Sequence, residues 1–332
     1  KEACYCGAAC QNLNWKRHKK KCAPPLPLKE VTRRVEAAHN AANWEEVLKW
    51  EGRMEELLER QDDGMKESIL SKFAHAYKRG KNSSGSNDHV HSVIRVELRR
   101  IELLGEMERF RDQGEVICSV AESLLFVDNL KDAKTWYLRA RKLGEQHGFI
   151  SVESDACLGL GQLAMTEGRH AEGLELIRNA FAAALLSEEW DNHQELNALR
   201  HLTSALFITY TIDGGVELID EVEPLVPRFG EMAKDESRYF GKLCLDELNN
   251  FYNSARLHEA RGRPHEAAAE VRALLARMRE NPATVQDSLP TCEVLLARVA
   301  GFLHLILSPE AGGEDLIKAV EDEQEKLRRG YT

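Results

Sequence analysis

Two stretches in the middle of the chain decide the fold: SVAESLLFVDNLKDAKTWYLRA at residues 119–140 and GLGQLAMTEGRHAEGLELIRNA at residues 159–180. They align without a gap at a spacing of 40 residues, and small and apolar residues fall in step. The aligned pairs include Ala121 with Gly161, Ala133 with Gly173, Tyr137 with Ile177 and Ala140 with Ala180. A unit that recurs at a fixed spacing is typical of stacked helix pairs, because each pair buries its apolar face against the next copy. The repeat therefore predicts an all-α solenoid.

Helix pairs of the same kind are expected along the rest of the body. The expected ranges are 31–58, 66–104, 195–233, 251–274 and 288–329. Residues about 79–89, RGKNSSGSNDH, are expected to form a polar, glycine-bearing loop. Pro224 and Pro227 are expected to interrupt a helix, because proline lacks the backbone N–H that a helix interior requires. Gly168 marks a turn between helices, since a residue without a Cβ adopts a positive φ freely.

Small residues recur at the eighth and twentieth positions of the repeat, where they allow its two helices to pack closely. The pairs are Ala121 with Ala133, Gly161 with Gly173 and Ala255 with Ala267. With these residues at this spacing, the body resembles tetratricopeptide (TPR) repeats in the longer, roughly 40-residue style of kinesin light chain. The resemblance implies a TPR-like α-solenoid of helix-turn-helix repeats. It implies a shape and no particular chemistry.

Composition and charge restrict the class of protein. Hydrophobic residues at 43% and charged residues at 30% indicate a soluble globular chain. Residues 1–22 carry a net charge of +5 and the remainder of the chain −15. The negative charge of the remainder argues against nucleic-acid binding by that part of the chain. The longest apolar stretch, residues 294–307, contains Arg298 and His304 and is too short to cross a membrane. Four cysteines scattered singly through the body suit reduced thiols in an intracellular protein: Cys118, Cys157, Cys244 and Cys292.

The other four cysteines crowd the first 22 residues, where Cys6-x3-Cys10 and His18-x3-Cys22 have the spacing of metal ligands. His18 and Cys22 would lie on one face of a helix, and thiolates with imidazole suit tetrahedral Zn²⁺. So short a segment has almost no core and would need the metal to fold. The alternative is a loose helix that holds no metal. The basic run at residues 16–21 is interpreted as a solvated helix face, with a nuclear signal or nucleic-acid contact as its alternative.

This stretch closely resembles the second half of a MYND-type zinc finger. The matching positions are Tyr5, Cys6, Cys10, Gln11, Trp15, His18 and Cys22. The family binds two zinc ions in an interleaved fashion, which implies that Cys6 and Cys10 share one ion. His18 and Cys22 would share the other. The family also has two Cys-x2-Cys pairs before this stretch, and neither is present in the chain. The resemblance thus implies a partial zinc finger.

In TPR proteins a peptide-binding groove is built from fixed positions of each first helix. Carried over by that resemblance, the groove residues are Glu115, Glu122, Asp155, Gln162, Asn249, Asn253 and Arg256. TPR domains that capture the C-terminal carboxylates of chaperones need lysine, asparagine and arginine there. Because the sets around Glu122 and Gln162 are acidic to neutral, we expect a basic or mixed peptide instead. The alternative is a solvated groove, with partners bound on the outer face or the loops.

Motifs for catalysis and cofactors are weak. Gly159-Leu-Gly161-Gln-Leu-Ala164 fits a dinucleotide-binding string, but it lies inside a repeat helix and lacks the preceding strand, so helix packing explains it better. Residues 88–91, DHVH, offer two imidazoles and a carboxylate without a supporting motif, which favours an exposed loop. No phosphate loop, nucleophile elbow or paired-carboxylate signature is found. The sequence therefore indicates a protein that is not an enzyme.

The expected layout is a partial MYND-type finger at residues 1–22, a proline-rich spacer at 23–29 and a TPR-like domain at 30–332. We expect a non-catalytic adaptor that binds protein or peptide partners, with Zn²⁺ as its only cofactor and no membrane contact. An intracellular location follows, with cytoplasm favoured over nucleus. The alternatives are a lysine methyltransferase that joins MYND, SET and helical repeats, opposed by the absence of a SET-like motif, and a nucleic-acid-associated regulator.

The resemblance to the zinc finger generates a prediction outside the chain. The coding sequence upstream of Lys1 is expected to supply two Cys-x2-Cys pairs, whose last cysteine lies six residues before Cys6. The longer product should then bind two zinc ions, measured by inductively coupled plasma mass spectrometry. An upstream sequence without those cysteines, or a longer product without zinc, would contradict the resemblance.

Overall fold

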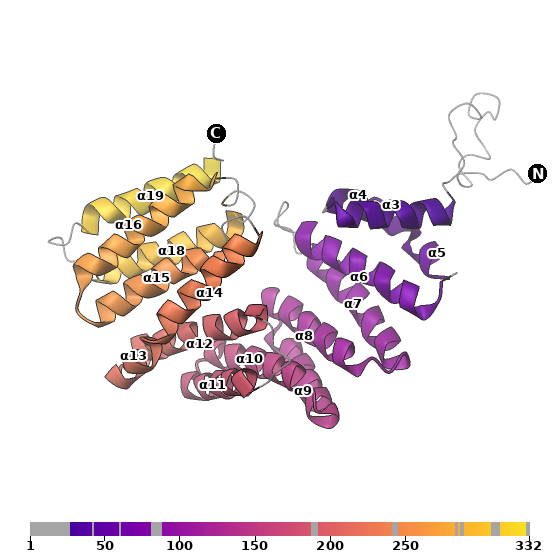
Figure 1. Cartoon of the computed structure of the whole chain (residues 1–332), viewed down its shortest axis with the longest axis horizontal. Helices are drawn as coiled ribbons and strands as arrows, with labels where there is room; N and C mark the ends of the chain where they lie inside the picture. Colours follow the sequence, from indigo (N-terminus) through magenta and orange to yellow (C-terminus); the bar gives the residue numbers. More distant parts are fainter. Residues whose placement is uncertain are drawn as a thin grey trace, which may run out of the picture. The chain divides into compact units, whose positions relative to one another are not determined.

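The computed structural model describes most of the body of the chain. The described residues are 27–41, 43–59, 61–80, 88–186, 192–240, 245–282, 285, 289–306 and 313–329. Within them the chain is helical and contains no strand, as predicted (Figure 1). The candidate zinc ligands Cys6, Cys10, His18 and Cys22 lie outside these residues, so the partial zinc finger stays a prediction. The chain divides into two compact units, Lys1–Met107 and Glu108–Thr332, which are described separately.

The first unit packs its helices around Val35, Leu57 and Phe73. Its elements are α3 (Leu28–Asn40), α4 (Trp44–Leu48), the 3₁₀ helix η1 (Glu51–Arg53), α5 (Met54–Glu59), α6 (Asp63–Gly80) and α7 (Asp88–Glu106). Helix α3 begins directly after Pro27. Proline is tolerated there because the first N–H groups of a helix have no partner within the helix. The expected spacer therefore ends before residue 29. Both ends of the expected loop at 79–89 are helical. His91 accordingly lies in α7 and not in a loop.

The second unit is a series of helix pairs (Figure 1). Its helices are α8 (Phe110–Phe126), α9 (Leu130–His147), α10 (Ile150–Thr166), α11 (His170–Leu186), α12 (Asn192–Asp213), α13 (Val216–Val222), α14 (Leu225–Phe240), α15 (Leu245–Ala260), α16 (Pro264–Glu280), α18 (Leu289–Ile306) and α19 (Gly313–Arg329). The break between α13 and α14 falls at Pro224, as predicted, whereas Pro227 lies in the first turn of α14 and does not interrupt it. Helices α8, α10, α12, α15 and α18 each contact the next member of that series. We call the surface that they form the first-helix face.

The repeats end their first helices in the same way. Asp128, Gly168 and Gly262 all have positive φ, at 60°, 79° and 68°. The following amide donates to a carbonyl five residues earlier: Asn129 N to Leu124 O at 2.9 Å, Arg169 N to Ala164 O at 2.8 Å and Arg263 N to His258 O at 2.8 Å. This is the bond of a Schellman cap, which satisfies a carbonyl that the helix leaves free. The turn predicted at Gly168 is therefore a repeated structural element.

The small residues of the repeat bring its two helices into backbone contact. A Cβ added at Gly161 would lie 2.9 Å from the carbonyl oxygen of Gly173 and 2.6 Å from a side-chain carbon of Ile177. At Gly159 the added atom would lie 2.2 Å from the ring of Tyr137, which is fully buried. The glycines of the dinucleotide-like string therefore serve helix packing, as predicted.

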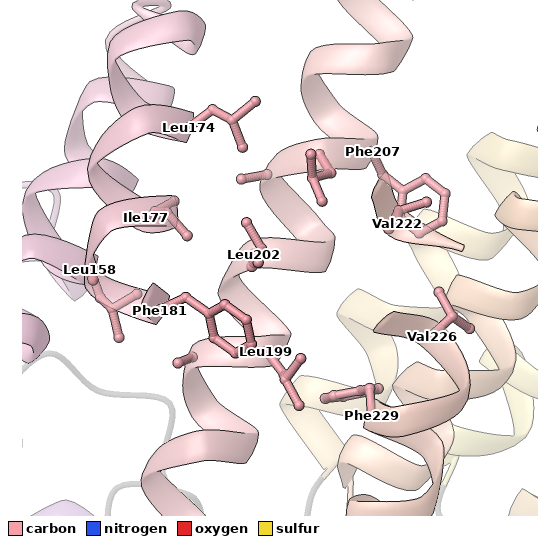
Figure 2. Packing of buried hydrophobic residues seen from close by; sticks show 14 of the residues in the cluster. Leu158, Leu174, Ile177, Phe181, Leu199, Leu202, Phe207, Val222, Val226 and Phe229 are labelled. Atoms are coloured by element: carbon pink, nitrogen blue, oxygen red, sulfur yellow. The ribbon is translucent and has the colours of Figure 1, made fainter. Parts of the chain in front are cut away.

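Helix α12 is enclosed on two sides by apolar side chains (Figure 2). Leu199 and Leu202 meet side chains of α11, including Phe181, while Val226 and Phe229 of α14 pack on the other side. Leu199 and Phe229 are completely buried. Two sides of α12 are buried in the core, so its remaining side contributes to the first-helix face.

The close approach at Gly161 predicts a costly substitution. Gly161→Ala should lower the free energy of unfolding by about 2 kcal/mol, because overpacking a tight contact outweighs the better helix propensity of alanine. Gly301→Ala is the matched control, since Gly301 also lies inside a helix and its added Cβ meets no atom within 4 Å. The control should be neutral or stabilising by up to about 1 kcal/mol in urea unfolding. Equal effects of the two substitutions would contradict the packing.

Candidate functional site

The predicted acidic groove residues lie together on the first-helix face. Glu115 and Glu122 project from α8 and Asp155 from α10. Burial raises the pKa of the Cys118 thiol well above its ordinary value, and the negative charges of these three carboxylates raise it further. The three carboxylates thus lie near one another on α8 and α10, and Glu115 is also 3.6 Å from Arg111 of its own helix.

Gln162, the next predicted groove residue, connects α10 to α12. Its amide nitrogen lies 2.6 Å from Nδ1 of His201. Donation by the amide requires an unprotonated Nδ1, so the ring is neutral with its proton on Nε2. Burial lowers the pKa of His201 to about 3, and the neighbouring charge of Arg200 contributes to the shift. The pair therefore adds no charge to the face near neutral pH.

The three remaining predicted residues, Asn249, Asn253 and Arg256, line a hollow between α12, α15 and α18. It consists of two adjoining cavities of about 330 and 590 Å³, which share Thr211, Tyr252, Arg256 and Arg298. The first cavity is also lined by Arg200, Ser204, Ile208, Ile212, Asn249 and Asn253, and the second by Phe207, Tyr210, Gly214, Glu259, Gly301 and Phe302. We call the two cavities together the arginine hollow. The structure thus divides the predicted groove set between an acidic and a basic region.

Arg256 is held in the arginine hollow by α12. Its Nη2 donates to the carbonyl oxygen of Phe207 at 2.9 Å and to the hydroxyl oxygen of Thr211 at 3.0 Å. The guanidinium carbon lies 4.5 Å from the centroid of the Phe207 ring and 5.7 Å from that of Tyr252, distances typical of cation–π contact. Burial lowers the pKa of Arg256, and its largest favourable charge interactions are with Tyr252 and Glu259. Burial also raises the pKa of Glu259.

Sequence reasoning missed the contributions of α12 and α18 to the arginine hollow. The register of residues 195–233 is ambiguous because α12 packs against two helices, α13 and α14, so Ser204 and Thr211 could not be aligned with Arg256. Arg298 lies in α18, for which the sequence offered no alignment with the other repeats. Cys118 and Leu158, on the same two helices as Glu115 and Asp155, are buried in the core.

Metal-ligating and nucleophilic side chains were also located in the described part of the chain. Within it, no group of three or more histidine, cysteine, aspartate or glutamate side chains is arranged to hold a metal ion. Cys118, Cys157 and Cys292 are buried thiols, and burial raises the pKa of each. Their depth and their high pKa values make them poor nucleophiles. No described helix is both long and apolar enough to cross a membrane.

Comparison with known proteins identifies the fold and no closer relationship. The chain matches no protein-family model and no curated protein sequence. Among solved structures it is similar to the apo form of RapI, with a TM-score of 0.61 and 12% identity over 92% of this chain and 100% of that one. It is also similar to the Rap conjugation gene regulator of plasmid pLS20 in complex with the Phr* peptide, with a TM-score of 0.57 and 13% identity over 99% and 80% of the two chains.

A third similar structure is a signal transduction ATPase with a tetratricopeptide repeat sensor from Pyrococcus horikoshii. The TM-score is 0.53 and the identity 13%, and the match covers 82% of this chain but only 41% of that one. At these identities the likeness concerns the fold alone. The chain is therefore a TPR-like α-solenoid, as its 40-residue repeat predicts.

The low pKa of His201 predicts a defined pH dependence. The folded pKa of about 3 lies below the ordinary value of 6.5, so the unfolded chain takes up the proton first as the pH falls. The contribution of His201 to stability is complete above pH 6.5 and is lost as the pH falls towards 3. His201→Gln removes this contribution, so urea unfolding should show a smaller loss of stability between pH 7 and pH 4.5 for the variant than for the wild type. Equal losses would contradict a buried, neutral His201.

Proposed function

We propose that the chain is a non-catalytic adaptor that binds an extended peptide segment of a partner protein on the first-helix face. The observation that carries this proposal is the arginine hollow. Within the described ranges, the amides of Asn249 and Asn253 form no hydrogen bond, although both side chains line the hollow. Amide side chains that are available as both donors and acceptors suit the backbone of a bound peptide.

The distribution of charge on the face supports a peptide of mixed charge. The region over α8 and α10 carries Glu115, Glu122 and Asp155, while the arginine hollow carries three guanidinium groups. Charge complementarity sets the orientation of a bound segment more than its affinity. A segment that covers both regions would place its basic residues over α10 and its acidic residues over α15. Of the basic or mixed peptide expected from the sequence, this proposal takes the mixed one.

The similar structures are compatible with this proposal. The pLS20 Rap regulator, which shares the fold, was solved in complex with the Phr* peptide. A TPR-like scaffold therefore accommodates a peptide in at least that protein. The partial MYND-type finger would add a second recognition surface, since such fingers recognise proline-containing peptides. Two recognition surfaces on one chain suit the assembly of a complex inside the cell, in the cytoplasm rather than the nucleus.

Filling the arginine hollow tests the proposed function. Ser204 lines the smaller cavity of about 330 Å³, and Ser204→Trp would occupy it without a change in charge. Affinity capture from cell extract, read by quantitative mass spectrometry, should show that the variant loses partners that the wild type retains.

Ala276→Trp is the matched control, because Ala276 is exposed on α16, a second helix that lies outside the first-helix face. The control should retain the full set of partners. The same partners on Ser204→Trp as on wild type would remove the first-helix face from consideration.

A further inference from the structure

We infer that the junction of the two cavities in the arginine hollow binds an anionic group of the peptide, a carboxylate or a phosphate, flanked by an apolar residue. This inference rests on the proposed function and specifies its ligand.

The first observation is that Arg256 and Arg298 lack a carboxylate partner. No ion pair joins either guanidinium to an acidic side chain within the described ranges of the unit. Other arginines of the same unit that contact a neighbouring helix do have such partners. Arg277 lies 2.9 Å from Glu247, Arg279 lies 2.8 Å from Glu323, and Arg178 pairs with Glu221. The arginine hollow departs from this pattern.

The second observation is that both of the hydrogen bonds described for Arg256 use one nitrogen. Nη2 donates to Phe207 and Thr211, and an arginine side chain has five N–H donors in all. The donors on Nε and Nη1 have no acceptor among the residues that the structure describes, and the side chain lines both cavities. Nε and Nη1 lie on different edges of the guanidinium, so each can offer an anion a charge-assisted hydrogen bond of its own. Arg256 is therefore held through Nη2 and keeps donors on Nε and Nη1 for a ligand.

The third observation is electrostatic. Arg298 is close enough to lower the pKa of Arg256, so the two like charges repel each other. Burial of an unpaired charge is unfavourable, and an anion between the two arginines would relieve both costs. Glu259 lines only the second cavity and forms no ion pair with Arg256 in the described structure. An acidic group supplied by a ligand would complete the arrangement.

The walls define what adjoins the anion. Ile212 is 56% exposed at the first cavity, whereas Phe207 and Phe302, which line the second, are buried. The exposed side chain of Ile212 beside a charged site indicates a contact with an apolar ligand group. Arg256 and Arg298 belong to both cavities, so a bound segment can continue on either side of the anion. This placement favours an acidic side chain inside the segment over a chain terminus.

A degenerate peptide library tests the inference with the 332-residue chain immobilised. Nine-residue peptides carry neutral residues at random around a central glutamate, phosphoserine, glutamine or lysine, and their C-termini are amidated. A second glutamine set has a free C-terminal carboxylate. Peptides retained by the chain are quantified by mass spectrometry. We expect about tenfold enrichment of an anionic set over amidated glutamine, with apolar residues beside the anion.

Enrichment of the glutamate, phosphoserine or free-carboxylate set identifies the bound anion as an acidic side chain, a phosphate or a chain terminus, respectively. Arg256→Met should abolish the enrichment. Arg298→Met should weaken it severalfold, and because Arg298 is exposed this variant does not endanger folding. Arg238→Met, which removes an exposed arginine of α14, should change nothing.

Three outcomes would overturn the inference. Peptides retained without a preference for the anion, or with a preference that survives in Arg256→Met and Arg298→Met, would contradict it and leave the proposed function standing. A failure to retain any peptide set would contradict the proposed function as well. Displacement of the peptides by a single-stranded oligonucleotide at lower concentration would assign the hollow to nucleic acid.

Discussion

The contact between the backbones of Gly161 and Gly173 is the constraint on which the second unit depends. An added Cβ at Gly173 would lie 2.7 Å from the carbonyl oxygen of Gly161, so α10 and α11 approach too closely at this point for a side chain on either glycine. Ala121 with Ala133, and Ala255 with Ala267, occupy the same positions in other repeats and are buried. Close packing within each pair, together with the shared Schellman turn, fixes which side of each first helix is left for ligands.

The arginines of the second unit fall into two groups. Arginines on or next to the second helices, such as Arg178, Arg261 and Arg277, are paired with glutamate or aspartate of neighbouring helices. Such partly exposed pairs add little stability each, but they leave no excess charge at the helix contacts. Arg256 of the hollow instead contacts a carbonyl and a hydroxyl group of α12 and an aromatic ring, and it lines open volume. The same residue type thus joins helices on one surface, while on the other we propose that it contacts a ligand.

The periodic part of the fold could be predicted from the sequence, because small residues at a fixed spacing report directly on helix contact. Gly161, Gly173 and the turn at Gly168 behave as their positions imply. Pro224 predicted that the second helix packed on α12 would be broken, as α13 and α14 are. The alignment of α12 with the other first helices could not be predicted, because a repeat with an inserted break no longer aligns with its neighbours. The position of Arg256 in a repeat predicted that it faces the groove. Arg298 and Thr211, which line the same hollow, were not predicted because their helices could not be aligned with the other repeats. The repeat spacing predicts which residues face the groove. It does not predict whether a charged residue there already forms an ion pair within the chain.

Site-specific photo-crosslinking tests the central claim, peptide binding on the first-helix face, most directly. Benzoylphenylalanine is placed at Ile212, which is 56% exposed at the arginine hollow, or at Leu138, which is 48% exposed on α9, a second helix. After irradiation with captured partners, tandem mass spectrometry locates the crosslinked segment. Peptide binding on this face predicts crosslinks from position 212 to one short segment of the partner that contains an acidic residue, and none from position 138. Crosslinks of equal yield from both positions, or from position 138 alone, would contradict it.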